Sequence, residues 1–392
     1  MQKYDVHVCL ISAQAAPNLL PILDSQFKPR KAIFLVSTSM KEKAQYLAHT
    51  FDKKGVKVEQ IKLEDEFDFT SLENQLIELL DQYADENIAL NVTGGTKLMA
   101  IAAQQVFSMA GKPIFYLDTE NNRLLFISKT EDNKNIPSQQ ILAKNDLDTY
   151  LSSYGFKLIQ KHTNTNQDLS YLGENFITYY QDYKNDIPLL NGYALLSEKS
   201  AFKARIEPNN SPPSSFIELL KDLSDENVIN YDKNKSQIDF KNKDTKEYLN
   251  GIWLEEYTYD SIKDIKIIDD IAFSVDVGNH KYQLKKSEYS PENKGNRNEF
   301  DVVFIAKNKL HIIECKTQIL ERNNGVKAED ILFKLETLKD YGGLLTKKCL
   351  VSYHEITSDA VHNRARELQI EIIQGKDLQR LRTKIQEWIG KK

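Results

Sequence analysis

Two carboxylates and a lysine in the last third of the chain have the types and spacing of a site that cleaves phosphodiester bonds. They lie within residues 298–317, whose sequence NEFDVVFIAKNKLHIIECKT predicts two strands joined by a tight turn. Because side chains alternate along a strand, Glu314 and Lys316 share one face, and Asp301 on the paired strand can face them. Two carboxylates can bind a hard divalent cation that holds a phosphate, and a lysine can orient the attacking water and offset negative charge.

Further oxygen donors near these residues could complete a metal site. They are the backbone carbonyl of Cys315 and the carboxylates of Glu299, Glu255 and Glu256, the last two on a predicted helix. A surface ion pair is the alternative interpretation for Glu314 and Lys316. The apolar flank LHIIECKT predicts burial, and buried charges are costly unless they have a function, so we favour a catalytic site.

A glycine turn early in the chain has the properties of an anion-binding loop. The sequence NVTGGTKLMA, residues 91–100, ends a predicted strand and begins a predicted helix. The first turn of a helix presents unpaired N–H groups, and Gly94 and Gly95 allow a ligand to approach the backbone closely. The turn contains neither GxGxxG nor a complete GxxxxGK[ST], which argues against a dinucleotide cofactor and a Walker loop.

Small polar turns also follow two other predicted strands, in the sequences ISAQAAPN and VSTSM. Ligands of doubly wound sheets bind where parallel strands end, so three polar strand ends favour a ligand site there. A glycine-capped turn that binds nothing is the alternative interpretation.

The elements that must position these residues fall into three regions. Residues 1–140 alternate strand and helix patterns, which predict a doubly wound, mostly parallel α/β sheet of the Rossmann type that ends in a hairpin. Residues 141–250 predict a linker and a small helix–wing unit, for which we favour a spacer role over DNA binding. Residues 251–392 predict a second α/β domain, with a helix, four strands that include 280–286, and then alternating helices and strands.

Composition narrows the class of protein. A chain of 392 residues suggests two or three domains, and no apolar run reaches the roughly 20 residues that a membrane helix needs. The three cysteines lie far apart, which fits a reducing cytoplasm rather than a disulfide framework. The chain is net acidic overall but net basic from residue 281 onward, so a phosphate-bearing partner is expected at the C-terminal end.

Together the two motifs resemble those of a CRISPR-associated Rossmann-fold (CARF) effector nuclease with a C-terminal PD-(D/E)xK endonuclease domain of the restriction-endonuclease type. The resemblance rests on TGGTKLMA, GIWLEEY, NEFDVVF and IIECKT, with FD in place of PD. It implies a homodimer that binds a cyclic oligoadenylate, most often cyclic tetra-adenylate, across its two-fold axis. It further implies a type III CRISPR antiviral nuclease that cuts DNA, single-stranded RNA or both, using Mn²⁺ or Mg²⁺.

The resemblance also implies roles for individual residues. The nuclease motif matches Asp301, Glu314 and Lys316, with Glu255 as the helix carboxylate, and Asp301, Glu314, Cys315 and Glu299 are the candidate metal ligands. The expected cyclic-oligoadenylate site is lined by Ser12, Ala13, Gln14, Ala15, Ser37, Thr38, Ser39, Thr93, Gly94, Gly95, Thr96 and Lys97.

Two other functions fit the same motifs. One is a ligand-responsive transcription regulator whose middle unit binds DNA and whose last domain is degenerate. The other is a restriction or repair nuclease whose first domain is only structural, so that no small ligand changes its activity.

Overall fold

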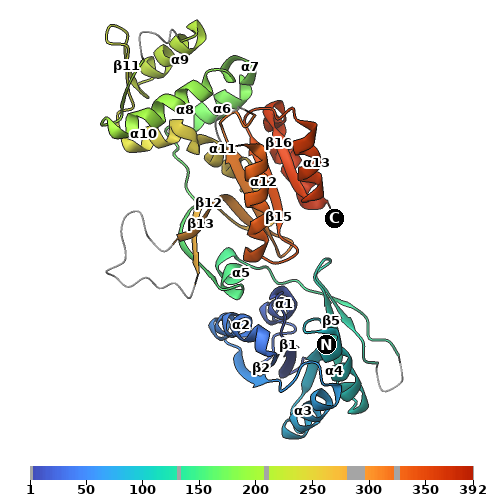
Figure 1. Cartoon of the computed structure of the whole chain (residues 1–392). Coiled ribbons are helices and arrows are strands. Elements are labelled where there is room, and N and C mark those ends of the chain that lie inside the picture. Colours follow the sequence, from blue (N-terminus) through green and yellow to red (C-terminus); the bar gives the residue numbers. More distant parts are fainter. Residues whose placement is uncertain (1–2, 130–133, 207–211, 280–295, 322–326, 392) are drawn as a thin grey trace.

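The computed structural model describes residues 3–129, 134–206, 212–279, 296–321 and 327–391, and Figure 1 shows them arranged along one long axis. An N-terminal α/β domain lies at one end, a second α/β domain lies in the middle, and a small helical unit lies at the other end. Among the described residues, no helix is long and apolar enough to cross a membrane.

The N-terminal domain is a doubly wound sheet, as the alternating pattern predicts. Its strand order is β3-β2-β1-β4-β5-β6-β7, parallel from β3 to β5 and antiparallel from there to β7. The strands are β1 Val6–Leu10, β2 Lys31–Val36, β3 Lys57–Lys62, β4 Ile88–Asn91, β5 Ile114–Asp118, β6 Arg123–Phe126 and β7 Gln139–Gln140. The helices are α1 Ala16–Leu23, α2 Lys41–Lys53, α3 Phe69–Gln82 and α4 Lys97–Met109.

Each face of this sheet is covered by a pair of helices. Side chains of α1 and α2 pack with Cys9 and Phe34, whereas side chains of α3 and α4 pack with Val8 and Ile33. Neighbouring residues of one strand thus belong to different cores, because a β-strand directs successive side chains to opposite faces.

The second domain is a six-stranded sheet of order β16-β15-β14-β13-β12-β8. Its strands are β12 Ile268–Asn279, β13 Asn296–Ala306, β14 Lys309–Lys316, β15 Lys347–Ser352, β16 Ile370–Gln374 and β8 Phe156–His162. Its helices are α11 Trp253–Ile262, α12 Ala328–Thr337, α13 Asp359–Glu367 and α14 Leu381–Gly390. Helices α11 and α14 cover the face of Ile313 and Cys315, and α12 and α13 cover the face of Ile312. The predicted strand 280–286 lies outside the described residues.

The domain boundary predicted at residue 250 does not contain this sheet, because one of its strands lies before that residue. Strand β8 lies in the region predicted as linker and middle unit, yet it pairs antiparallel with β12 at the sheet edge. The sequence FKLIQKH of β8 alternates only weakly, so its pairing is decided by the neighbouring strand rather than by its own pattern. The second domain is therefore built from two separate segments of the chain.

Between these segments lies the small unit. It contains α6 Ser170–Thr178, α7 Tyr180–Tyr183, α8 Ile187–Leu196, α9 Ser214–Asp225, α10 Lys243–Glu247 and a three-stranded sheet of β9 Lys203–Arg205, β10 Asn230–Asp232 and β11 Gln237–Asp239. The predicted hairpin is confirmed as the antiparallel pair β10 and β11. Leu190 of α8 belongs to the same apolar core as Trp253 of α11, so the unit is packed onto the second domain.

A connecting helix, α5 Leu147–Ser153, joins the two α/β domains. Its residues Leu147 and Tyr150 are buried in one continuous core with Leu47 of α2 and Leu335 of α12. The Tyr150 hydroxyl donates a hydrogen bond of 2.9 Å to the carbonyl of Gly342 in the second domain. The two domains therefore share a core instead of being linked by a loose tether.

The buried histidine of β1 predicts an acid-sensitive fold. His7 is 2% exposed, and burial lowers its pKa to about 3, so the unfolded chain binds a proton at higher pH than the folded chain. The free energy of unfolding is therefore unaffected by His7 at pH values above its ordinary pKa of about 6.5, and it declines as the pH falls below that value. Between neutral pH and pH 5 we expect the burial of His7 to lower the free energy of unfolding by roughly 2 kcal/mol.

Denaturant unfolding of the wild type and of His7→Leu at pH 7.5 and pH 5 measures this cost. The stability difference between the two proteins should shift by that amount in favour of the variant at the lower pH. An identical pH dependence in both proteins would contradict the assignment.

Candidate active site and ligand site

The pairing of β13 with β14 brings the predicted carboxylates together. Val302 pairs with Ile313, so Asp301 and Glu314 lie side by side one residue beyond that pair. Both side chains are buried, at 9% and 3% exposure. Strand alternation carries Cys315 to the opposite face, where it packs with the core under α11.

The Lys316 ammonium lies among three oxygen atoms. Its Nζ is 3.1 Å from Asp301 Oδ2, 2.7 Å from Glu314 Oε1 and 2.9 Å from the Cys315 carbonyl oxygen. Asp301 Oδ2 also accepts a 2.7 Å hydrogen bond from the Cys315 N–H, which fixes the carboxylate. The structure thus brings Asp301, Glu314, Cys315 and Lys316 to one point, as their spacing predicts.

These oxygens fit a hard divalent cation, because three donors already converge on one positive charge. Among the described residues, however, no group of three or more His, Cys, Asp and Glu side chains is arranged to hold a metal ion. An ion at this point would therefore use the two carboxylates together with the Cys315 carbonyl or water.

A second lysine, which the sequence analysis missed, also contacts the site. Lys334 of α12 donates to both carboxylate oxygens of Glu314, at 2.8 and 3.0 Å. Its side chain is 42% exposed, whereas that of Glu314 is 3% exposed. Helix α12 covers the sheet face toward which Glu314 points. No local pattern in the sequence predicts the contact between Lys334 and Glu314.

The pKa shifts follow from burial and from these two ammonium groups. Burial raises the pKa of Asp301 above its ordinary value despite Lys316. Burial would also raise the pKa of Glu314, but Lys316 and Lys334 outweigh it and lower the pKa instead. Burial opposes the charge of Lys316, yet Asp301 and Glu314 raise its pKa. The ammonium groups therefore outweigh the effect of burial at Glu314 but not at Asp301.

The other candidate carboxylates lie around this cluster. Glu255 of α11 accepts a 2.7 Å hydrogen bond from the Ser274 hydroxyl, and burial and then Asp301 raise its pKa well above the ordinary value. Glu256 is directed elsewhere and accepts from the Asn166 N–H at 2.7 Å. Glu299 of β13 is exposed as a whole residue, but its carboxyl is partly desolvated, and this desolvation followed by the charge of Asp301 raises its pKa. Of the two helix glutamates, Glu255 is the one near Asp301.

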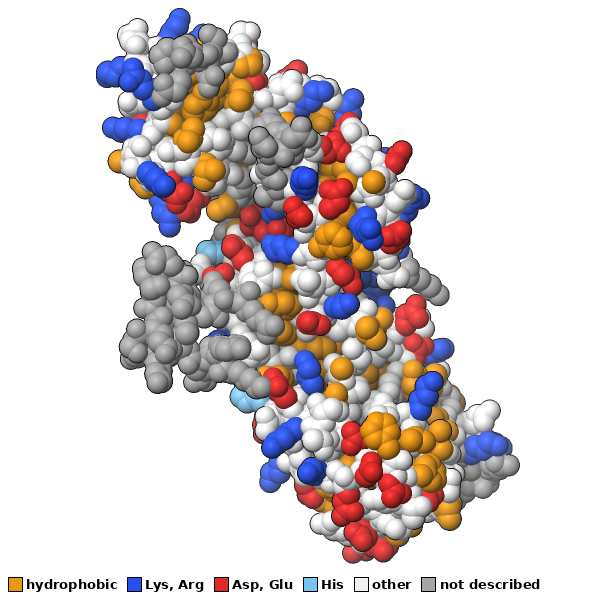
Figure 2. Space-filling view, in the orientation of Figure 1, with side chains coloured by type: hydrophobic (Ala, Val, Ile, Leu, Met, Phe, Trp, Pro, Cys, Tyr) orange, Lys and Arg blue, Asp and Glu red, His pale blue; other side chains and the backbone are white. Residues whose placement is uncertain are grey.

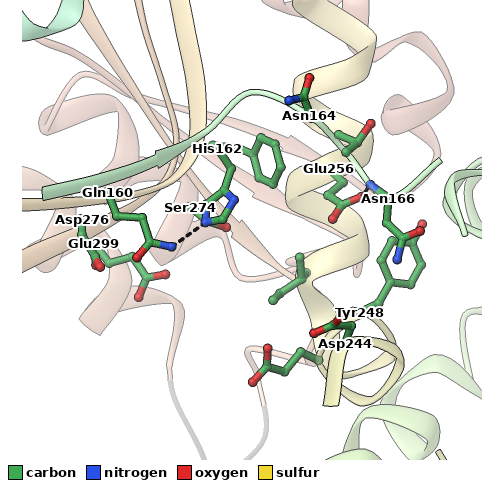
Figure 3. Close-up of a pocket in the computed structure, with 14 residues that line it drawn as sticks. Gln160, His162, Asn164, Asn166, Asp244, Tyr248, Glu256, Ser274, Asp276 and Glu299 are labelled. Atoms are coloured by element: carbon green, nitrogen blue, oxygen red, sulfur yellow. Dashed lines mark hydrogen bonds between the residues drawn. The ribbon is translucent and has the colours of Figure 1, made fainter. Parts of the chain in front are cut away.

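Two cavities flank the cluster. The first has a volume of about 620 Å³, and Figure 3 shows it between α11, β12 and the end of β8. Its walls carry one histidine, His162, hydrogen-bonded to Gln160, and five carboxylates: Asp244, Glu247, Glu256, Asp276 and Glu299. The second has a volume of about 520 Å³ and is lined by α8, Glu255 and the residues from Cys315 to Gln318.

In the N-terminal domain, the three polar loops lie at one sheet edge. Strands β2, β1 and β4 are parallel neighbours, so the loops that follow them are adjacent. These loops, with the first residue of α4, contain all the residues expected at the ligand site: Ser12 to Ala15, Ser37 to Ser39 and Thr93 to Lys97.

The glycine turn has the geometry that its sequence predicts. A Cβ atom on Gly94 would lie 2.0 Å from the Leu10 carbonyl oxygen, so no other residue fits without movement. Gly95 has a φ of +74°, which favours glycine. The Thr96 hydroxyl accepts from the Met99 N–H at 3.2 Å and caps α4, and Lys97 is exposed in its first turn.

Thr93 holds the turn in place rather than offering a free hydroxyl. Its hydroxyl donates to Asn91 Oδ1 and accepts from the Leu117 N–H, both at 2.7 Å. The buried Asn91 amide donates to Asn18 Oδ1 at 2.8 Å and so ties the β4 loop to α1. The sequence analysis did not single out Asn91, although a buried amide at a strand end is the available signal.

Gln14 connects the ligand edge with the second domain. Its Oε1 accepts a 3.0 Å hydrogen bond from the N–H of Leu344. Leu344 lies shortly after α12, the helix that carries Lys334. One predicted ligand residue therefore contacts the segment that follows α12, the helix whose Lys334 contacts Glu314.

The fold and the two sites define a two-domain α/β protein with a Rossmann-like ligand domain and a nuclease-type domain. Family models identify both domains more closely. Residues 6–146 match the Card1 CARF domain, and residues 242–392 match the Card1-like endonuclease domain. The chain thus carries a Card1 CARF domain followed by a Card1-like endonuclease domain.

Solved structures share this architecture. Protein VC1899 from Vibrio cholerae superposes with a TM-score of 0.82 at 24% identity, covering 98% of each chain. Can2 from Sulfobacillus thermosulfidooxidans, in complex with cyclic tetra-adenylate, gives 0.78 at 23% identity, covering 99% of this chain and 98% of that one. A type III CRISPR defence DNA nuclease activated by cyclic oligoadenylate gives 0.52 at 15% identity, covering 92% of this chain and 48% of that one. No curated protein matches the sequence.

Removing one buried carboxylate tests the cluster. Asp301→Asn should lower cleavage at least about a hundredfold, the usual scale for losing a group that stabilises the transition state. The same change should not lower the unfolding temperature, because a carboxyl with a raised pKa costs stability at neutral pH. Cleavage rates and thermal unfolding measure the two effects.

The matched control is Asp276→Asn, which removes a carboxylate of the acidic cavity on the neighbouring strand β12. It should affect cleavage far less. Similar rate losses in both variants would mean that general charge, rather than the Lys316-centred cluster, governs activity.

Proposed function

We propose that this protein is a nuclease activated by a cyclic oligoadenylate, with cyclic tetra-adenylate as its ligand, that acts in type III CRISPR antiviral defence on DNA, single-stranded RNA or both. The observation that carries the proposal is the convergence of Asp301, Glu314 and Cys315 oxygens on Lys316, in a chain whose first domain is a CARF domain. The complex of the structurally similar Can2 with cyclic tetra-adenylate supports the choice of ligand.

The residues that would hold Mn²⁺ or Mg²⁺ are Asp301, Glu314 and the Cys315 carbonyl, with Glu299 and Glu255 nearby. Such an ion would offset charge on the scissile phosphate and lower the pKa of a bound water. The Lys316 ammonium, which lies beside both carboxylates, would orient the phosphate and the attacking water and offset negative charge. Glu255, whose pKa burial and then Asp301 raise well above its ordinary value, is the candidate to exchange a proton with the attacking water or the leaving oxygen.

The N-terminal domain would bind the ring as a homodimer. Exposed apolar side chains recur along α4 at Leu98, Ile101 and Met109, and Figure 2 shows hydrophobic side chains gathered over this part of the domain. Exposed apolar surface of this kind suits an interface between two copies. A two-fold contact there would place two sets of glycine-turn loops around one symmetric ring.

A continuous chain of contacts could couple the ring to cleavage. Gln14 contacts Leu344, the segment before Leu344 leads back into α12, and Lys334 of α12 holds Glu314. A ring that draws Gln14 toward itself would shift this segment and change the hold on Glu314. The ring must then favour one of the two arrangements, because equal affinity for both shifts nothing.

A cleavage assay tests the proposed function against its two rivals. Supercoiled plasmid, single-stranded DNA and single-stranded RNA are each incubated with Mn²⁺ or Mg²⁺, with and without cyclic tetra-adenylate. We expect at least one substrate to be cut only with both the metal and the ring, and Glu314→Gln to be inactive. Cutting that ignores the ring would indicate a nuclease with a structural first domain, and tight operator binding without cutting would indicate a regulator.

The second lysine predicts a change in metal affinity. Lys334→Met removes a positive charge that competes for Glu314, so Mn²⁺ should bind roughly tenfold more tightly, as expected for a unit charge about 5 Å from a divalent ion in water. Calorimetric titration of Mn²⁺ into the protein without substrate measures this. Lys339→Met, which breaks an exposed pair with Glu336 on the same segment, is the control and should leave the affinity unchanged. Equal affinities in all three proteins would refute a competing role for Lys334.

A further inference from the structure

The two cavities beside the catalytic cluster share a wall but differ in charge. Glu247 and Ile252 line both. The cavity of Figure 3 carries five carboxylates, which repel a polyanionic strand. The cavity beside α8 carries two carboxylates and the Lys316 ammonium. Charge alone therefore favours the α8 side for a strand whose phosphate must reach the cluster.

The lining of the α8 cavity combines apolar surfaces with side-chain amides. Pro188 and Leu195 of α8 and Ile252 supply apolar walls, and Leu195 is 59% exposed. Asn250 and Gln318 supply amide donors and acceptors. A planar base needs both kinds of contact: apolar surfaces against its faces and hydrogen-bonding groups at its edges.

Hydrogen bonds fix the wall of the α8 cavity relative to the catalytic residues. With its amide oriented to satisfy both neighbours, Asn191 of α8 accepts from the Thr317 hydroxyl at 2.8 Å and donates to the Leu249 carbonyl at 2.8 Å. Thr317 directly follows Lys316, so α8 is fixed to the end of β14. The chain kinks within Tyr248–Ile252, where Gly251 has a φ of +137° and a Cβ atom on it would lie 3.0 Å from Thr317 Oγ1.

We infer that the α8 cavity binds the base of the nucleotide next to the scissile phosphate. This inference rests on the proposed function and assigns the small unit a part in substrate binding instead of a spacer role. The volume of about 520 Å³ lies within the range of about 300 to 1,000 Å³ usual for small-molecule sites. Lys316 and Glu255 line the same cavity, so a base held there brings its phosphate to the catalytic cluster.

Gly192 allows the cavity to be filled without disturbing the fold. It is an exposed residue of α8, it lines the cavity, and no atom lies within 4 Å of the place where its Cβ would be. Leucine favours a helix more than glycine does, so Gly192→Leu should not lower the unfolding temperature. Gly390→Leu, at an equally open position in α14, is the matched control.

Binding is measured with fluorescent single-stranded oligonucleotides on the full-length Glu314→Gln protein, with saturating cyclic tetra-adenylate. Adding Gly192→Leu should weaken binding at least tenfold, adding Gly192→Ala should have a smaller effect, and adding Gly390→Leu should have none. Ring affinity, measured separately, should be the same in all four proteins.

An oligonucleotide with a single abasic position, moved along the strand, identifies the base concerned. One position should weaken binding to the parent protein, and at that position Gly192→Leu should cause no further loss, because the two changes remove the same contact. Full additivity at every position, or unchanged binding by Gly192→Leu, would overturn the inference. If the parent binds strands in this way but the wild type cuts none of them, the proposed function fails and the base site stands.

Discussion

The neutralisation of buried negative charge at the end of β14 is the constraint on which the nuclease-type site depends. Asp301 and Glu314 are withdrawn from water, and carboxylates in that position must be paired or lose their charge. Lys316 pairs with both, but one ammonium balances only one of the two carboxylates. Lys334 supplies a second positive charge to Glu314 from helix α12. Burial still raises the pKa of Asp301, so additional positive charge beside this carboxylate would stabilise its ionised form.

This electrostatic arrangement is tied mechanically to the rest of the molecule. Helix α12 carries Lys334 and also packs into the core that runs through α5 to the N-terminal sheet. Displacing α12 would disturb the partner of Glu314 and the boundary between the domains together, because packed cores rearrange as units rather than deform continuously. The Gln14 contact to Leu344 lies on the same path.

The sequence predicts those features that follow from local periodicity. Alternation along β14 places Glu314 and Lys316 on one face, and strand–helix alternation yields the doubly wound N-terminal sheet with its polar strand ends at one edge. Contacts that depend only on tertiary packing cannot be predicted from local periodicity. Lys334 reaches Glu314 because a helix crosses the sheet, and β8 joins the sheet because a distant strand offers an edge. Thr93 lies at the expected position, but its hydroxyl already forms hydrogen bonds with the Asn91 side chain and the Leu117 N–H.

The split origin of the nuclease-type sheet has a consequence for biosynthesis. Strand β8 leaves the ribosome well before β12, its partner at Ile268–Asn279, and the whole small unit is translated between them. The edge of the sheet therefore cannot close until that insertion has emerged, and the segments carrying Asp301 and Lys334 follow later still. A nascent chain can thus complete the strands and helices of its N-terminal sheet before the segments that carry Asp301, Glu314 and Lys334 have been synthesised.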